Sequence, residues 1–459
     1  MNEGQTAFPF LAIFSLCAGI FAFYVYYTSV LPIAAYMVVD YHTASNLNTA
    51  GYAAGWIGGI FMLGRLLSAI PFGYLADHWG RKPCLVLSMI TEGVLGIIFG
   101  FSTSYKQALI VRGLSGFANG FMTVLPIVTT ELVDCKEHEI RAFGYANAAN
   151  SCGFLFGSTV GGLLSRSAVQ FPLVFSASSL WGQYPYLLPN LVCALFASAA
   201  AIMIMIWVPE TKPFSLSHQD EIINLKPRRS YVQYSSIVTS IEVEISPRRS
   251  PQTMALVLTA FQLTLYSMMI KEIFPLWCVS SPVTGGLAWT PPQIVLVLAG
   301  VAVLLMTFQV FWYQPLMAMC QSTSLAMVLH YQLLGGALSI MLLPLSKLLP
   351  VTTFAVRYAA IVLIFAVHNV CIVSSYSALA ILINGSVHPR ERGRLNGYTA
   401  TAFTMGNFAA PVVGSSLFAW LNDISTGGLL NGQLVFGLCG LLLILLALLV
   451  KRTITENNA

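Results

Sequence analysis

The chain has 459 residues, of which 57% are hydrophobic and only 8% are charged, and its formal net charge is +5. A soluble domain averages about 25% charged residues, so this composition excludes an ordinary soluble protein and indicates an integral membrane protein. The nine cysteines are scattered singly, without the spacing of a zinc site or a disulfide framework. No phosphate-binding loop or HExxH motif occurs. We therefore expect no enzyme activity, no cofactor, no bound metal and no nucleic-acid partner.

Twelve mostly apolar windows follow one another, each of about the 20 residues that a helix needs to cross the bilayer core. Their expected bounds are roughly residues 8–34, 49–76, 83–101, 106–131, 141–164, 185–208, 253–278, 291–317, 323–345, 353–384, 394–420 and 430–450. The first window has no basic residue before it and is too long for a signal peptide, so we expect it to remain as a membrane helix. The sequence predicts an all-α membrane protein with twelve transmembrane helices.

One long polar interval, from Pro209 to Ser250, separates the sixth and seventh windows. It predicts an N-terminal six-helix half at 1–208, a cytoplasmic linker at 209–252 and a C-terminal six-helix half at 253–459. With the N-terminus inside, 15 of the 22 Lys and Arg residues fall on the cytoplasmic side, as the positive-inside rule requires. Both termini are therefore expected in the cytoplasm, with the chain in the plasma membrane or in a vacuolar or lysosomal membrane.

The two halves also share a short repeat. A shift of 253 residues lays RAFGYANAA, from Arg141, on RLNGYTATA, from Arg394, and places Gly153 on Gly406 and Gly161 on Gly414. The fifth helix thus corresponds to the eleventh. A parallel repeat of six helices is the arrangement of major facilitator transporters, which place a central cavity between the halves.

The stretch GYLADHWGRKP, from Gly73, concentrates charge in a chain that has little. Asp77 lies at the C-terminal end of the second helix, where the helix dipole disfavours an anion. Either Arg81 and Lys82 or the N-terminus of the eleventh helix compensates it, and Gly73 and Gly80 allow backbones to approach closely. A contact with the eleventh helix would latch the halves on the cytoplasmic face. In the alternative, the basic residues only set topology and Asp77 is solvated.

These residues carry a resemblance. GYLADHWGRKP and VRGLSGFANG, from Val111, resemble signature motifs of the major facilitator superfamily, and longer runs from Gly51, Tyr184 and Lys271 resemble its zinc-induced facilitator-like branch. The resemblance implies a secondary transporter, often proton-coupled, that exports small organic solutes, metal chelators or ions. Two features differ from the branch. The cysteine-bearing loop motif of the plant members is absent, and GFLFGSTVGG in the fifth helix has Ser158 where the pattern has proline.

Ionisable residues at membrane depth are costly and by default indicate function, with structural pairing as the competing interpretation. At about 1.5 Å per residue, Arg65 and Glu92 reach nearly the same depth on adjacent helices. We expect them to form a structural ion pair. In the alternative, Glu92 carries a proton.

Arg112 and Glu272 fall near the outer ends of the fourth and seventh helices, both of which line the cavity in the fold that the resemblance implies. Glu272 is expected to take up a proton. Arg112 is expected to shift the pKa of Glu272 or to bind an anionic substrate. In the alternative, Lys271 and Glu272 only snorkel to the outer interface as a topological anchor. Tyr24 and Tyr27 are candidates for stacking on a planar solute, or are ordinary interfacial aromatics.

His368 and Asn369, near the middle of the tenth helix, are candidates for substrate contact or for hydrogen-bonded packing. Close helix packing is expected at small residues and one proline: Gly116, Gly120, Gly153, Gly157, Gly161, Gly406, Pro411 and Gly414.

These observations favour a proton-linked, alternating-access transporter for a small organic solute, acting as a monomer in the lipid bilayer. Two alternatives are a membrane sensor of the same fold, which would usually add a long cytoplasmic domain, and a uniporter for neutral sugars.

Overall fold

The described part of the protein consists of helices joined by turns and loops. The computed structural model describes residues 8–47, 49–133, 135–211, 251–312, 325–349, 354–386, 392–424 and 433–455, and these ranges contain no strand. Nearly all of the expected linker lies outside them, as does part of the window expected at 291–317.

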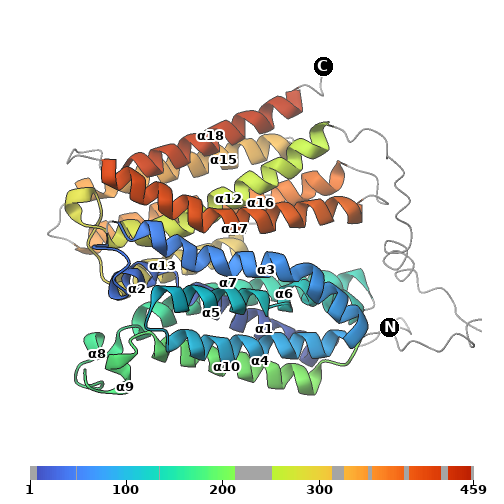
Figure 1. Cartoon of the computed structure of the whole chain (residues 1–459). Helices are drawn as coiled ribbons and strands as arrows, with labels where there is room; N and C mark the ends of the chain where they lie inside the picture. The colour runs from blue at the N-terminus through green and yellow to red at the C-terminus, as the bar shows by residue number, and fades with distance from the viewer. Residues whose placement is uncertain are drawn as a thin grey trace, which may run out of the picture.

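The helices form two groups, one below and one above in Figure 1. The first comprises α1 (Phe10–Ser29), α2 (Ala34–Asp40), α3 (Gly51–Trp79), α4 (Arg81–Gly100), α5 (Tyr105–Phe117), α6 (Phe121–Glu131), α7 (Lys136–Leu164), α8 (Ser167–Gln170), α9 (Leu180–Gln183) and α10 (Leu187–Trp207). The second comprises α12 (Pro251–Val279), η2 (Pro282–Thr284), α13 (Pro291–Thr307), η3 (Phe308–Trp312), α15 (Leu325–Leu342), η5 (Leu343–Leu348), α16 (Phe354–Gly385), α17 (Arg392–Ile424) and α18 (Gln433–Thr455).

Nine helical segments within the described ranges are long and apolar enough to cross a membrane. The other three expected windows are occupied by α7 and α17, with 29 and 33 residues, and by the shorter apolar helix α13, with 17. The chain is therefore a multi-pass membrane protein, and a helix lies at each expected window.

Two windows differ from the expected single helices. In the window expected at 8–34, helix α1 already ends at Ser29, and the short helix α2 follows it. The window expected at 106–131 holds two helices, α5 and α6, with a break between them. Close packing on α3 accompanies the break. A Cβ atom on Gly116 would lie 2.0 Å from the carbonyl oxygen of Phe61, and one on Gly120 would lie 1.9 Å from the ring of Phe72.

The repeat seen in the sequence is also a repeat of packing. Gly153 of α7 packs on α1, where its Cβ position is 2.7 Å from the Phe21 carbonyl oxygen. Gly406, its counterpart on α17, packs on α12, and its Cβ position is 3.1 Å from the Phe261 carbonyl oxygen. In the repeat, α7 therefore corresponds to α17 and α1 corresponds to α12. Phe21 of α1 corresponds to Phe261 of α12.

The same correspondence recurs further along these helices. Gly161 packs on Ser29, and its counterpart Gly414 packs on Met269. Met269 lies as far beyond Phe261 on α12 as Ser29 lies beyond Phe21 on α1. The fifth and eleventh helices of the sequence thus occupy equivalent places, as predicted. Gly157, which lies between Gly153 and Gly161, packs on Thr28.

Contacts between the two groups follow the same repeat. The shift of 253 residues places Gly162 on Ser415, and the 240 residues that separate Phe21 from Phe261 also separate Gly51 from Pro291. The Cβ position of Gly51 on α3 is 2.6 Å from the carbonyl oxygen of Ser415 on α17, and that of Gly162 on α7 is 3.2 Å from the carbonyl oxygen of Pro291 on α13. Figure 1 shows α17 lying along α3. These two equivalent contacts close one end of the molecule, which we name the sealed end. The opposite end, which carries Asp77 to Arg81, is named the motif end.

One face of α3 shows that the two ends differ. Gly55 and Gly73 are separated by about five full helical turns and so share a face, as do Gly59 and Asp77. A Cβ atom on Gly55 or Gly59 would overlap α17, whereas one on Gly73 meets no atom within 4 Å. The Asp77 side chain is 61% exposed. On this face α3 packs tightly on α17 at the sealed end and not at the motif end.

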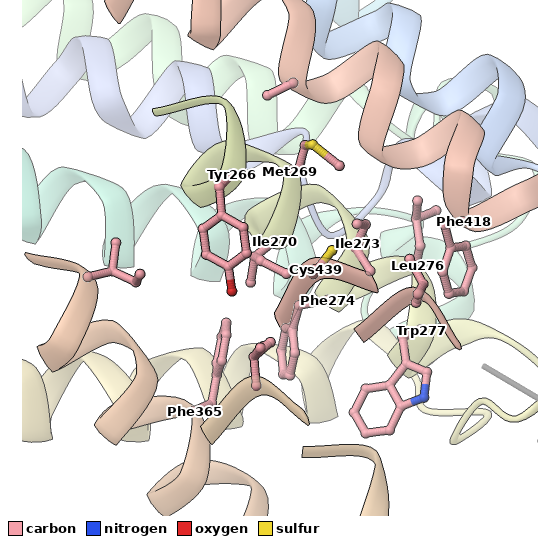
Figure 2. Packing of buried hydrophobic residues seen from close by; sticks show 14 of the residues in the cluster. Tyr266, Met269, Ile270, Ile273, Phe274, Leu276, Trp277, Phe365, Phe418 and Cys439 are labelled. Carbon is pink, nitrogen blue, oxygen red and sulfur yellow. The ribbon is translucent and has the colours of Figure 1, made fainter. Parts of the chain in front are cut away.

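Helix α12 packs tightly within the second group, and Figure 2 shows its residues from Tyr266 to Trp277 beside Phe365, Phe418 and Cys439. The ring of Phe274 stacks on Phe365 of α16 with centroids 4.2 Å apart, and Trp277 meets Phe436 of α18 edge to face at 5.3 Å. Aromatic contacts of this kind add to the burial of apolar area. This packing holds α12 in place, including residues 271 and 272.

Candidate functional site

Arg81 connects three elements at the motif end. Its guanidinium lies 3.4 Å from the Asp77 carboxylate and 3.2 Å from that of Glu131 on α6. The backbone N–H groups of Arg81 and Lys82 donate to the Glu210 carboxylate at 2.9 and 3.2 Å. That carboxylate satisfies free N–H groups at the start of α4, where the helix dipole favours an anion.

Gly80 links α3 to α4 with φ +117°, a conformation that favours glycine. The expected latch between Asp77 and the start of α17 is not formed by the described side chains, since Asp77 pairs with Arg81 and is largely exposed. The side chains at 391–394 lie outside the described residues. The latch therefore stays a prediction, for a conformation in which the motif end is closed.

Arg112 is buried in the first group among aromatic rings. Its guanidinium carbon lies 4.5 Å from the centroid of the Tyr26 ring and 4.6 Å from that of Phe61, and one of its N–H groups donates to the Tyr27 carbonyl oxygen at 3.1 Å. Two further guanidinium nitrogens are buried without a hydrogen-bond partner. Ring faces attract a cation, so α1, α3 and α5 together hold this charge in place.

Glu272 is buried on α12, and its side chain reaches the first group. Its Oε1 atom lies 3.2 Å from the Cβ position of Gly58 on α3. Arg112 and Tyr27 are its neighbours within electrostatic range. Arg112 and Glu272, on the two helices expected to line the cavity, are thus within electrostatic range of each other but do not form a salt bridge.

The expected ion pair between Arg65 and Glu92 is not formed in the described part of the chain. Glu92 instead accepts a hydrogen bond from Asn119 Nδ2, and Arg65 lies over the Phe23 ring, 4.8 Å from its centroid. Side chains at the same depth on adjacent helices meet only where the rotation of the helices also brings them together. Both Arg112 and Arg65 remain within electrostatic range of Glu92.

The two candidate tyrosines of α1 lie in one aromatic cluster. The ring of Tyr27 stacks on Phe61 at 5.8 Å and on Phe23 at 6.3 Å, and Tyr24 meets Phe23 edge to face at 5.0 Å. Tyr27 is buried and Tyr24 is half-buried. Of the two, Tyr24 therefore has the more accessible ring.

Lys271 makes a contact between the two groups. The sequence alone did not place this residue in the site. Its ammonium lies 4.7 Å from the centroid of the Phe154 ring on α7, while its neighbour Glu272 faces α3. Successive residues of a helix point about 100° apart, so the pair contacts two helices of the first group. The signal in the sequence was the adjacent pair of opposite charges inside an apolar window.

His368 contacts residues of the second group. Its Nδ1 atom is 3.0 Å from the carbonyl oxygen of Gly336 on α15, and its ring is parallel to that of Phe365. Asn369 donates to the Phe365 carbonyl oxygen one turn earlier, at 2.7 Å. These contacts match the packing alternative for both residues.

A separate cavity of about 720 Å³ lies at the sealed end, among residues that include Asp40, Tyr41, His42, Ser102 and Tyr186. None of the expected site residues lines it. Within the described residues, no three His, Cys, Asp or Glu side chains gather as a metal site would require.

Comparison with known proteins agrees with this arrangement. The Major Facilitator Superfamily profile matches residues 15–274. A probable peptide/nitrate transporter of Arabidopsis thaliana is 29% identical over 430 residues, which cover 92% of this chain and 86% of the relative. The protein ZINC INDUCED FACILITATOR 1 of the same plant is 28% identical over 475 residues, which cover 100% and 94%.

Solved structures share the fold at low identity. The D-xylose–proton symporter has a TM-score of 0.69 at 14% identity and covers 97% of each chain. A bacterial homologue of the lysosomal transporter Spinster has a TM-score of 0.66 at 13% identity, with coverage of 98% of this chain and 97% of the homologue. The chain therefore belongs to the major facilitator superfamily of membrane transporters and resembles its zinc-induced facilitator-like branch.

Proposed function

We propose that this transporter exports a small organic solute in exchange for protons, with Glu272 as the group that carries the proton. The observation that carries the proposal is the place of this carboxylate: it is buried, yet it lies at the α3–α17 contact that closes the sealed end. Intramembrane carboxylates of this kind are typical of proton relays.

The position of Glu272 suggests how proton access would alternate. With the sealed end closed, the Glu272 carboxylate lies against Gly58 of α3, whose Cβ position also contacts Pro411 of α17. Separation of α3 from α17 would expose it there, and closure would return it to the interior. On the expected topology the sealed end faces the outside or the lumen, so a proton taken up there and released to the cytosol would drive solute outward.

Arg112 would make release of the proton favourable. A fixed cation within electrostatic range of a carboxylate stabilises its charged form, and Arg112 is held by rings on two sides. The planar guanidinium suits this stacked place better than a lysine ammonium would. In this proposal, termini in the cytoplasm and function as a monomer follow from the charge distribution and from the seal formed within one chain.

A flux assay in proteoliposomes tests the proposal. A panel of organic solutes, with and without a pH gradient, first supplies a transported reporter. Glu272→Gln should then abolish accumulation driven by the gradient, while exchange of labelled for unlabelled solute continues, because exchange needs no net proton movement. Asp423→Asn, which neutralises an exposed carboxylate on α17, is the matched control and should keep both activities. Full gradient-driven accumulation by Glu272→Gln would exclude this residue as the proton carrier.

A further inference from the structure

The segment between α7 and α10 has an unusual composition for a connection outside the membrane helices. Residues 167–186 contain no Asp, Glu, Lys, Arg or His. They include five aromatic residues: Phe171, Phe175, Trp181, Tyr184 and Tyr186. A loop in water normally carries charge, whereas Trp and Tyr are enriched where a membrane meets water.

Its apolar side chains point away from the protein. Leu173 is fully exposed, and Val174 and Val169 are 74% and 69% exposed. Phe171 and Leu180 are exposed as well. Contiguous apolar surface of this kind marks an interaction site when single exposed residues would not.

The segment is held in a defined shape. At its base, the Arg166 N–H donates to the Pro185 carbonyl oxygen at 2.7 Å, so the two ends of the loop are joined. Arg166 also pairs with Asp40, with 3.6 Å between Nε and Oδ2. Gln170 donates to the carbonyl oxygens of Gly162 and Ser165 at the end of α7. The loop therefore has a defined shape. We name its exposed apolar residues, Val169, Phe171, Leu173, Val174 and Leu180, the apolar rim.

The polar groups of the loop are largely satisfied internally. The backbone N–H groups of Val174 and Phe175 both bond to the Phe171 carbonyl oxygen, and those of Gly182 and Gln183 bond to that of Ser179. The hydroxyls of Ser176 and Ser178 bond to each other, and the Ser179 hydroxyl donates to the Ser176 carbonyl oxygen. Internal pairing lowers the cost of moving backbone out of water.

The loop is also placed beside lipid. Figure 1 shows α8 and α9 beyond the start of α10, on the side of the first group that faces away from the second. Helix α10 itself exposes large apolar side chains along its length, among them Leu195, Ile202 and Ile206. The apolar rim of the loop thus continues the lipid-facing surface of α10 past its end.

We propose that residues 167–183 lie in the membrane interface at the sealed end, with Val169, Phe171, Leu173 and Val174 inserted among the lipids of that leaflet. The occupant of this surface is the bilayer, because the loop carries no charge to pair with a protein partner and adjoins the lipid-facing surface of α10. Insertion would stabilise the first group next to Arg166 and Asp40. The proposal does not depend on which solute is transported or on which residue carries the proton.

An environment-sensitive fluorophore tests the insertion. The full-length protein, with its native cysteines replaced, is labelled with NBD at Leu173→Cys and reconstituted in nanodiscs that hold one copy. Compared with a label at Thr43→Cys, an exposed loop position at the same end, the label at 173 should show blue-shifted emission, several-fold weaker quenching by aqueous iodide and strong quenching by spin-labelled lipid. Iodide quenching equal to that at position 43 would overturn the proposal.

A second variant separates lipid contact from protein contact. With the label moved to Leu180→Cys, the added change Val174→Asp should shift the emission to longer wavelength by placing a charge in the interface, whereas Ser178→Asp, at an already polar position, should shift it less. Protection that survives Val174→Asp, or that appears only in discs with two copies, would assign this surface to a protein contact and refute lipid insertion.

Discussion

Replacing Gly55 by alanine should weaken the seal between α3 and α17, and replacing Gly73 should not. The two glycines share one helix face, but a Cβ atom on Gly55 would lie 1.7 Å from Ser415 Oγ and 2.3 Å from the Pro411 carbonyl oxygen, and one on Gly73 meets nothing within 4 Å. The serine can rotate away. The carbonyl oxygen belongs to the backbone, so α3 and α17 must separate by about 1 Å to reach the ordinary contact distance between such atoms.

The magnitude follows from this overlap. Overpacking a tight contact costs about 1–3 kcal/mol, which changes the ratio of sealed to open conformers by about 5- to 150-fold. Alanine also gains about 1 kcal/mol over glycine inside a helix. That gain is the same in both conformers and in both variants, so it does not affect the comparison.

Cysteine modification measures the seal directly. Ala419, which lies beside Gly51 in the contact, is replaced by cysteine in a background without native cysteines, and its reaction with an impermeant maleimide is timed from the sealed-end side. Gly55→Ala should speed the reaction by about 5- to 150-fold, and Gly73→Ala should leave it unchanged or slow it. Equal rates in the two folded variants would refute the steric account of the seal.

Two further predictions concern the first group. In a double-mutant cycle on folded yield, neutralising Glu92 should couple more strongly to neutralising Arg112 than to neutralising Arg65, because Arg112 is its stronger charged neighbour; equal couplings would contradict this order. At the sealed end, burial raises the pKa of Tyr41 to about 12, against the partial opposing effect of its Ser102 hydrogen bond. Its stabilising contribution is therefore complete below the unfolded pKa of about 10 and is lost as the pH rises from 10 through 12. Alkaline unfolding should show a smaller loss for Tyr41→Phe over that window.

Much of the fold could be predicted because hydropathy and charge report directly on lipid and water. The apolar windows, the repeat between the fifth and eleventh helices and the burial of Glu272 follow from composition, from spacing and from the cost of charge in lipid. The break between α5 and α6 could not be predicted, since it depends on how closely Gly116 and Gly120 approach α3. The separate short helix α2, which begins shortly after the end of α1, could not be predicted either.

The side-chain partners were harder to predict because they depend on helix rotation. Arg65 and Glu92 were expected at the same depth, yet Asn119 takes the place at Glu92 that the arginine was expected to fill. Lys271 looked like an interfacial anchor beside Glu272. The structure shows that the two residues contact different helices of the first group, which only the packing of α7 and α3 around α12 could reveal.

Different forces hold the two ends of the molecule, so the ionic strength of the surrounding solution affects the two ends differently. The sealed end closes through glycines, carbonyl oxygens and small side chains, whose contacts are steric and insensitive to ions. The motif end is organised by Arg81 with Asp77, Glu131 and Glu210, in partly exposed pairs that salt screens over about 10 Å at 0.1 M. On the expected topology, the gate that meets an outside or lumenal fluid of changing composition depends on shape. The gate that depends on charge meets the cytosol, where ionic strength is regulated.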